Sequence, residues 1–132
     1  TSMRNHLPAT VAEWAVQGHT VRVGLALGAH TALQAHITLE SMQLLGLQVG
    51  LPVLALCKAT AVHIAPIAHD TGQWLPGTVS RIDATPADTE LSLTLATGQQ
   101  LVGFGSAQTP WALGQAVHAR IDANSVVLAI GP

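Results

Sequence analysis

The chain has 132 residues, which is enough for one ordinary domain or for two very small ones that share a core. Charged residues make up 9% of the sequence and hydrophobic residues 48%, so we expect a partner subunit to cover much of the surface. The net charge of −2 argues against nucleic-acid binding by this chain, and no apolar run reaches the roughly 20 residues of a membrane span.

The first half of the chain reads as short strands interrupted by one helix. Partial alternation of apolar and polar residues predicts a strand at 20–27. Thr38 can cap a helix at 39–45, and Gly46 can end that helix in the left-handed conformation. An apolar segment at 53–65 predicts a strand, a turn and a second strand, and it contains Lys58, one of only five basic residues.

The second half repeats the first. Leu-Pro-Ala-Thr-Val at 7–11 returns as Leu-Pro-Gly-Thr-Val at 75–79, and the segment at 53–65 returns in similar form at 117–129. A stretch rich in polar and turn-forming residues separates the two copies. We therefore predict a first repeat, a linker and a second repeat, at 1–66, 67–72 and 73–132.

The two repeats differ in one element. The stretch of the second repeat that matches the helix, 103–110, is rich in glycine, ends in Pro110 and can hold at most a turn. Short strands separated by turns at roughly ten-residue spacing are typical of a small barrel. We therefore predict an all-β fold with one short helix, built as tandem OB-like five-stranded barrels.

Side chains able to hold a small tetrahedral oxyanion gather in the first repeat. Ser2 and Arg4 stand at the chain start, Thr38 and Ser41 in the first turn of the predicted helix, and Lys58 at a strand end. Arginine and lysine supply positive charge, and hydroxyls and helix N-termini supply neutral donors. Each residue also has a plain structural explanation, such as helix capping for Thr38.

The second repeat serves as an internal control for this interpretation. It keeps the apolar framework of the first repeat but lacks the donors. If the four donors were needed only for the fold, the second repeat would have less reason to lose all of them together. We therefore expect the first repeat to bind the anion. The residues that replace Arg4, Thr38, Ser41 and Lys58 are Gly72, Val102, Gly105 and Asp122.

Other kinds of site are not indicated. The seven histidines show no pair at helical i, i+4 spacing, and the single Cys57 offers no Cys/His motif, so we expect no structural metal. Catalytic motifs are absent too, so we expect no enzyme. One cysteine excludes an internal disulfide and the chain start does not read as a secretory signal, which favours a cytoplasmic location.

Together these segments resemble a molybdate-binding Mop domain of the TOBE type. Thr-Ser-Met-Arg-Asn at 1–5 is similar to the start of that family's motif, and 37–41, 45–53 and 58–59 are similar to the rest. The tandem arrangement resembles the C-terminal half of bacterial molybdate-responsive transcription regulators. The resemblance covers nearly the whole chain.

The resemblance implies two OB-like barrels in a homo-oligomer, most simply a dimer, with molybdate or tungstate bound at a subunit interface and no further cofactor. DNA would be bound only through an N-terminal winged-helix domain that this sequence does not contain. The family's ligands carry over as Ser2, Arg4, Thr38, Ser41, Lys58 and the backbone of Ala59.

Three alternatives remain open at this point. The chain could be a free-standing molybdate-storage protein, the regulatory tail of a molybdate transporter ATPase, or a dimerisation module without a ligand. Transporter tails usually carry one copy of the domain, and the donors missing from the second repeat argue against a plain module. The sequence leaves open whether molybdate or tungstate binds better, and whether the chain forms a dimer or a trimer.

Overall fold

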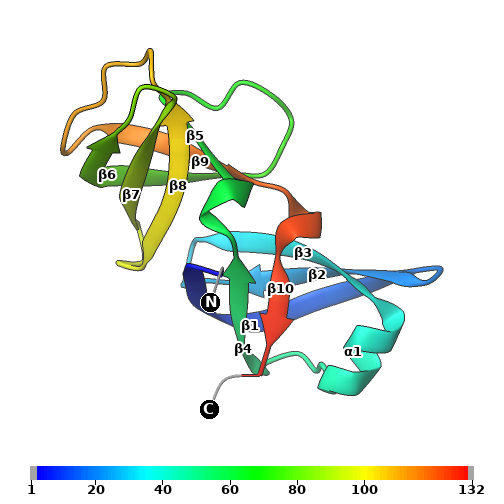
Figure 1. Ribbon diagram of the computed structural model, residues 1–132. Coiled ribbons are helices and arrows are strands. Elements are labelled where there is room, and N and C mark those ends of the chain that lie inside the picture. Colours follow the sequence, from blue (N-terminus) through cyan, green and yellow to red (C-terminus); the bar gives the residue numbers. More distant parts are fainter. Residues whose placement is uncertain (1–2, 131–132) are drawn as a thin grey trace.

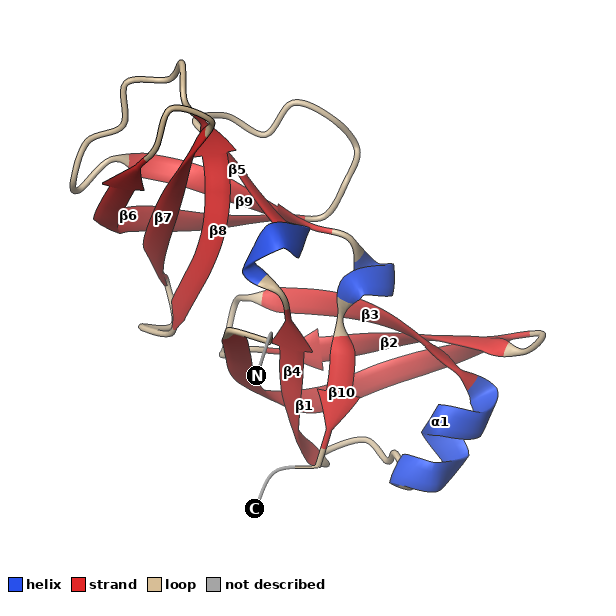
Figure 2. Cartoon of the chain, viewed as in Figure 1, coloured by secondary structure: helices blue, strands red, loops and turns tan. Residues whose placement is uncertain are grey.

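The computed structural model describes residues 3–130, and in this range strands are the main regular structure (Figures 1 and 2). The only α-helix of the described residues, α1, falls where the sequence predicts it, so the all-β prediction with one short helix is confirmed. The elements in chain order are β1 (Asn5–Gln17), β2 (Thr20–Ala26), β3 (Ala32–Thr38), α1 (Leu39–Leu45), β4 (Pro52–Cys57), the 3-10 helix η1 (Ala59–Ala61), β5 (Val62–Ala65), β6 (Trp74–Ala84), β7 (Asp88–Leu95), β8 (Gln100–Ser106), β9 (Ala116–Ile121), the 3-10 helix η2 (Ala123–Ser125) and β10 (Val127–Ala129).

The strands form two five-stranded units. The first unit is a sheet with the order β10-β4-β1-β2-β3, and its two edge strands, β10 and β3, come into contact and curl it toward a barrel. The second unit is a closed barrel with the order β5-β8-β7-β6-β9. Buried residues alternate along β1 and β7, so each strand turns one face to the interior. This arrangement agrees with the predicted OB-like fold.

Each unit contains one strand from the other repeat. β5, at the end of the first repeat, pairs with β8 and β9 in the closed barrel. β10, at the end of the second repeat, pairs with β4 in the first sheet. The two units therefore do not follow the repeat boundaries, and the division into 1–66, 67–72 and 73–132 stays a prediction about the sequence. Neither unit is complete without a strand from the other repeat.

Matching backbone irregularities support the alignment of the two repeats. β1 has a bulge at 11–13, and β6 has one at 79–81. Gly50 and Gly114 have positive φ angles of 91° and 82°, which favour glycine, and their N–H groups donate to the carbonyls at the two bulges at 2.8 Å. These positions are therefore comparable in structure.

The predicted matches of Thr38 with Val102 and of Ser41 with Gly105 are wrong. The Asn5 amide bonds both backbone groups of Val102 as the Gln73 amide bonds those of Gln34, so β3 and β8 match at an offset of 68 residues. Ser106, at the end of β8, therefore takes the place of Thr38, and the second repeat does not lack a hydroxyl there.

The missing helix of the second repeat has a packing explanation. The prediction that 103–110 holds at most a turn is wrong for 103–106, which belong to β8. After β8 ends at Ser106 the chain does form turns, and Trp111 packs against the core. The ring of Trp111 lies so close to Gly105 that a Cβ at this glycine would come within 2.4 Å of it. The indole N–H donates to the carbonyl of Ser106 at 2.9 Å. In the first repeat, helix residues pack against the core instead.

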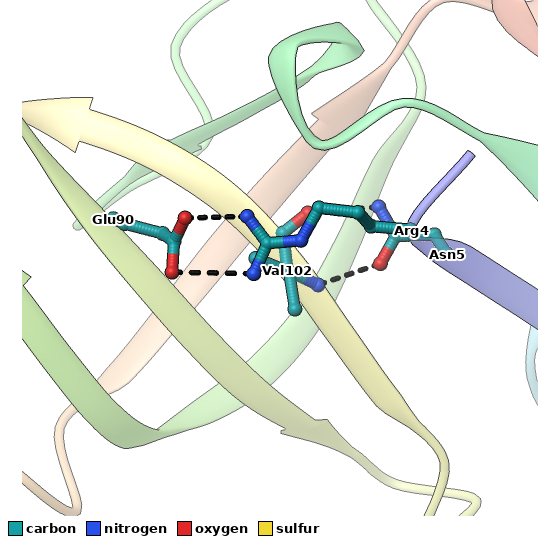
Figure 3. Close-up of polar contacts among 4 residues, drawn as sticks. All are labelled: Arg4, Asn5, Glu90 and Val102. Carbon is teal, nitrogen blue, oxygen red and sulfur yellow. Dashed lines mark hydrogen bonds and ion pairs between the residues drawn. The ribbon is translucent and has the colours of Figure 1, made fainter. Parts of the chain in front are cut away.

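Asn5 connects the two units through buried polar contacts. Its side chain is 2% exposed; Nδ2 donates to the carbonyl of Val102 at 2.8 Å, and Oδ1 accepts from the N–H of Val102 at 2.7 Å (Figure 3). One amide side chain thus satisfies both backbone groups of a residue in β8, which fixes the start of β1 against the second unit.

We expect Asn5→Ala to lower the free energy of unfolding by about 1–2 kcal/mol, because it leaves two partly buried backbone groups of Val102 without partners. Chemical denaturation would measure the loss. Gln99→Ala is the control: between the units it removes one exposed contact, from Nε2 to the carbonyl of Pro8 at 2.8 Å, and within its turn it removes the hydrogen bond that Oε1 accepts from the Thr97 hydroxyl. It should cost less stability than Asn5→Ala. Equally small losses in both variants would contradict a structural role for Asn5.

Among residues 3–130, no helix has the length and hydrophobicity that crossing a membrane requires.

Candidate anion-binding site

The predicted ligand residues form two groups in the first unit. Arg4, Lys58 and Ala59 make up the first, which we call the N-terminal half-site. Thr38 and Ser41 make up the second, which we call the helix half-site. Ser2, the sixth predicted ligand, lies outside the described residues.

Strand pairing brings the N-terminal half-site together. Asn5, the first residue of β1, pairs antiparallel with Cys57, the last residue of β4. Arg4 and Lys58 are the next residues beyond this pair, so they extend from neighbouring strand ends. Cys57 itself is a buried small hydrophobic residue, as expected from its place in an apolar strand, and burial raises the pKa of its thiol.

Lys58 is an exposed cation directly before η1. Among residues 3–130 its ammonium group forms no hydrogen bond or ion pair, whereas Ala59, the next residue, is 4% exposed and holds the backbone in place. The matched residue, Asp122, precedes η2, and its carboxylate accepts from the N–H of Asn124 at 2.9 Å. The aspartate therefore has a local capping role that the lysine does not share.

Arg4 is engaged with a carboxylate that sequence reasoning missed. Its two terminal nitrogens donate to the two carboxylate oxygens of Glu90, at 2.5 and 3.3 Å (Figure 3). The hydrogen bond from Arg4 lowers the pKa of the Glu90 carboxyl group and raises the pKa of the guanidinium. Glu90 is 86 residues away in the sequence, on β7, and no local pattern marks it as a partner of Arg4.

The helix half-site has the capping geometry that the sequence predicts. Oγ1 of Thr38 accepts from the N–H of Ser41 at 3.0 Å and donates to its hydroxyl oxygen at 2.8 Å. Gly46 ends the helix with φ 63° in the left-handed region. Because the Thr38 proton is used within the pair, the Ser41 hydroxyl is the group that can donate to a ligand.

Both residues of the helix half-site line an open groove between α1, β3 and β10, with a volume of about 560 Å³. Its lining mixes polar and apolar side chains, and His36 Nδ1 lies 3.2 Å from Asn124 Oδ1 in it. The apolar lining includes Leu44 and Val127, which are 80% and 45% exposed. Such exposed apolar side chains usually mark a contact surface.

The two half-sites lie at different places in the chain. α1 packs on β2 and β3, and Figure 1 shows it away from η1 and from the start of β1. Within residues 3–130 no hydrogen bond or ion pair links Arg4 or Lys58 to Thr38 or Ser41. The six-residue ligand set stays a prediction, and the described fold of a single chain gathers it in two parts.

No cluster of three or more His, Cys, Asp or Glu side chains suited to a metal ion occurs in 3–130.

Comparison with known proteins gives three related findings. Residues 1–64 match the model of the TOBE domain. The DNA-binding transcriptional dual regulator ModE of Escherichia coli (strain K12) is 37% identical over 119 residues, which cover 86% of this chain and 45% of the regulator. The transcriptional regulator ModE of Yersinia pestis is 34% identical over 137 residues, which cover 98% of this chain and 52% of the regulator. The chain spans about half the length of these relatives.

A solved structure resembles the whole chain. The cytoplasmic molybdate-binding protein ModG, crystallised with molybdate bound, matches with a TM-score of 0.90 and 27% identity, covering 99% of both chains. The TOBE match covers nearly all of the first repeat, where every predicted ligand lies, and the likeness to ModG extends over both units. The resemblance seen in the sequence is thus confirmed: residues 1–64 match the TOBE domain, and the chain is related to the ModE regulators and shares the fold of ModG.

Proposed function

We propose that this chain binds molybdate or tungstate and acts as the effector-sensing part of a molybdate-dependent transcription regulator. The observation that carries the proposal is Lys58, an exposed cation without a partner in 3–130, beside Arg4 in a fold that ModG shares with molybdate bound. The ModE relatives supply the regulatory role. The chain is then a binding module in the cytoplasm, without catalysis and without a cofactor besides the oxyanion.

The site is completed by a second copy of the chain. The N-terminal half-site supplies both positive charges and the helix half-site supplies hydroxyl donors, and the separation of the two supports a ligand held between subunits. The groove beside the helix half-site has exposed Leu44 and Val127 on its wall, which fits a covering subunit. Two-fold symmetry would create two equivalent sites in a dimer.

A free-standing molybdate-binding protein is the second candidate. ModG is matched over 99% of both chains, whereas the ModE regulators extend over about twice the matched length. The two roles differ in DNA binding, which the regulator would carry out through a winged-helix domain ahead of Thr1. Sequencing the gene upstream of the codon for Thr1 would distinguish them: a winged-helix coding region supports the regulator, and a start codon supports the free-standing protein.

We expect molybdate and tungstate to bind more tightly than sulfate or phosphate by more than about tenfold. The predicted ligand groups all donate hydrogen bonds, while monohydrogen phosphate carries a proton that needs an acceptor, and sulfate is smaller and fits loosely. Isothermal titration with each anion would measure the affinities. At a molybdate concentration of about 100 Kd, the native state should gain roughly 2.7 kcal/mol in a thermal melt. Equal affinities for molybdate and sulfate would refute the assignment.

A further inference from the structure

In the described chain, both terminal nitrogens of the Arg4 guanidinium are hydrogen-bonded to Glu90. Both carboxylate oxygens accept from the guanidinium, one from each terminal nitrogen (Figure 3). A tetrahedral oxyanion presents a similar pair of oxygens to an arginine fork. The same donors therefore serve either the internal carboxylate or an external anion, and one guanidinium edge cannot bind both in this geometry.

We propose that Glu90 sets the affinity of the oxyanion site by holding Arg4 while the site is empty, and that Arg4 exchanges Glu90 for the oxyanion on binding. This inference rests on the proposed function, since it assigns Arg4 to the ligand. It adds a residue from the second repeat to a site whose predicted ligands all belong to the first.

The exposure of the pair makes this exchange feasible. The Arg4 and Glu90 side chains are 48% and 25% exposed, so solvent and ions reach both. Exposed ion pairs of this kind contribute little free energy, and breaking one is a small penalty. A dianion attracts the Arg4 guanidinium more strongly than the single charge of the Glu90 carboxylate does, and Lys58 helps to hold the dianion in place.

The surroundings allow the Arg4 side chain to move while its backbone stays in place. Asn5, the next residue, is buried and held on both sides of its amide by Val102. The charge of Arg81 also contributes to the lowered pKa of the Glu90 carboxyl group, after the larger effect of Arg4. This favourable interaction remains when Arg4 turns to a ligand.

The exchange also connects the site to the contact between the two units. Arg4 precedes β1 of the first unit, and Glu90 lies on β7 of the second. Binding at Arg4 removes one contact between the units and leaves the Asn5 contact intact. Because Glu90 and the oxyanion compete for the same guanidinium nitrogens, a change that weakens the Arg4–Glu90 pair is expected to strengthen oxyanion binding.

The test is a molybdate titration of Glu90→Gln beside the wild-type chain. We expect the variant to bind up to about fivefold more tightly, the fold-change that corresponds to an exposed ion pair. Two controls neutralise other carboxylates. Asp83→Asn removes a charge directly across from Glu90 on β6, and Glu13→Gln removes the partner of Arg22, 3.1 Å away. Both controls should bind like the wild type, and a thermal melt without ligand should show all variants folded.

The outcomes separate the two proposals. If the wild-type chain binds no molybdate, the proposed function fails and this inference fails with it. If the wild type binds and Glu90→Gln binds equally or more weakly, only the role of Glu90 is overturned. Equal tightening by Glu90→Gln and Asp83→Asn would also overturn it, because a general charge effect would then explain the gain.

Discussion

Replacing Lys58 by alanine is expected to weaken molybdate binding by about two orders of magnitude without unfolding the chain. The side chain is exposed and makes no hydrogen bond or ion pair in 3–130, so its removal takes away no contact that holds the described fold. A charged hydrogen bond contributes about 1.5–3 kcal/mol, and the upper value corresponds to roughly 150-fold in affinity. Titration calorimetry would measure the affinity, and a thermal melt would check the fold.

The second repeat offers a matched control for this variant. Asp122→Ala changes the equivalent position and should leave affinity unchanged, while loss of its cap to Asn124 lowers stability slightly. Arg22→Ala removes a cation of β2 that pairs with Glu13 and should also bind normally. Lys58→Arg, which keeps the charge, should retain part of the affinity. An alanine variant at Lys58 with wild-type affinity would place the site elsewhere.

Local signals made part of this structure predictable. Thr38 and Gly46 mark the ends of α1 because a capping hydroxyl and a left-handed glycine act on backbone groups within a few residues. The repeat was also readable, since Gly50 and Gly114 serve the same turn in both copies. In each case the chemistry that decides the structure is contained in a short stretch of sequence.

The exchange of strands between the units was not predictable in this way. β5 at 62–65 and β10 at 127–129 are both short and apolar, and either would fit the open edge of either unit. Which sheet each one joins depends on the path of the chain through η1 and η2, which the hydrophobic pattern does not encode. The Arg4–Glu90 pair was missed for a similar reason, because only the packed units bring two residues so distant in sequence together.

The register of β1 and β4 also changes how the binding residues are grouped. By sequence distance, Ser2 and Arg4 stand apart from Thr38, Ser41 and Lys58. The pairing of Asn5 with Cys57 instead places Arg4 and Lys58 at neighbouring strand ends, away from α1. To test whether a site is shared between two chains, one chain must carry a variant in the N-terminal half-site and the other a variant in the helix half-site. Two variants in the same half-site would damage both sites of a mixed dimer.

Mixing Lys58→Ala chains with Ser41→Glu chains is expected to restore one binding site per mixed dimer. Alone, each variant should bind poorly, the first for lack of charge and the second because a carboxylate in the helix half-site repels the oxyanion. Glutamate three residues after Thr38 forms a capping box, so the second variant should keep or gain helix stability. In the mixed dimer, one site receives intact Lys58 and intact Ser41, and the other receives both defects.

The measurement is the stoichiometry of molybdate binding after subunit exchange, with exchange confirmed by mass spectrometry of differently tagged chains. One site per mixed dimer at wild-type affinity supports a ligand held between two copies of the chain. A mixture of Lys58→Ala with Arg4→Ala is the negative control, since both defects fall in the N-terminal half-site and recovery is not expected. Failure of the first mixture to recover binding, with exchange complete, would mean that each site is built within one chain.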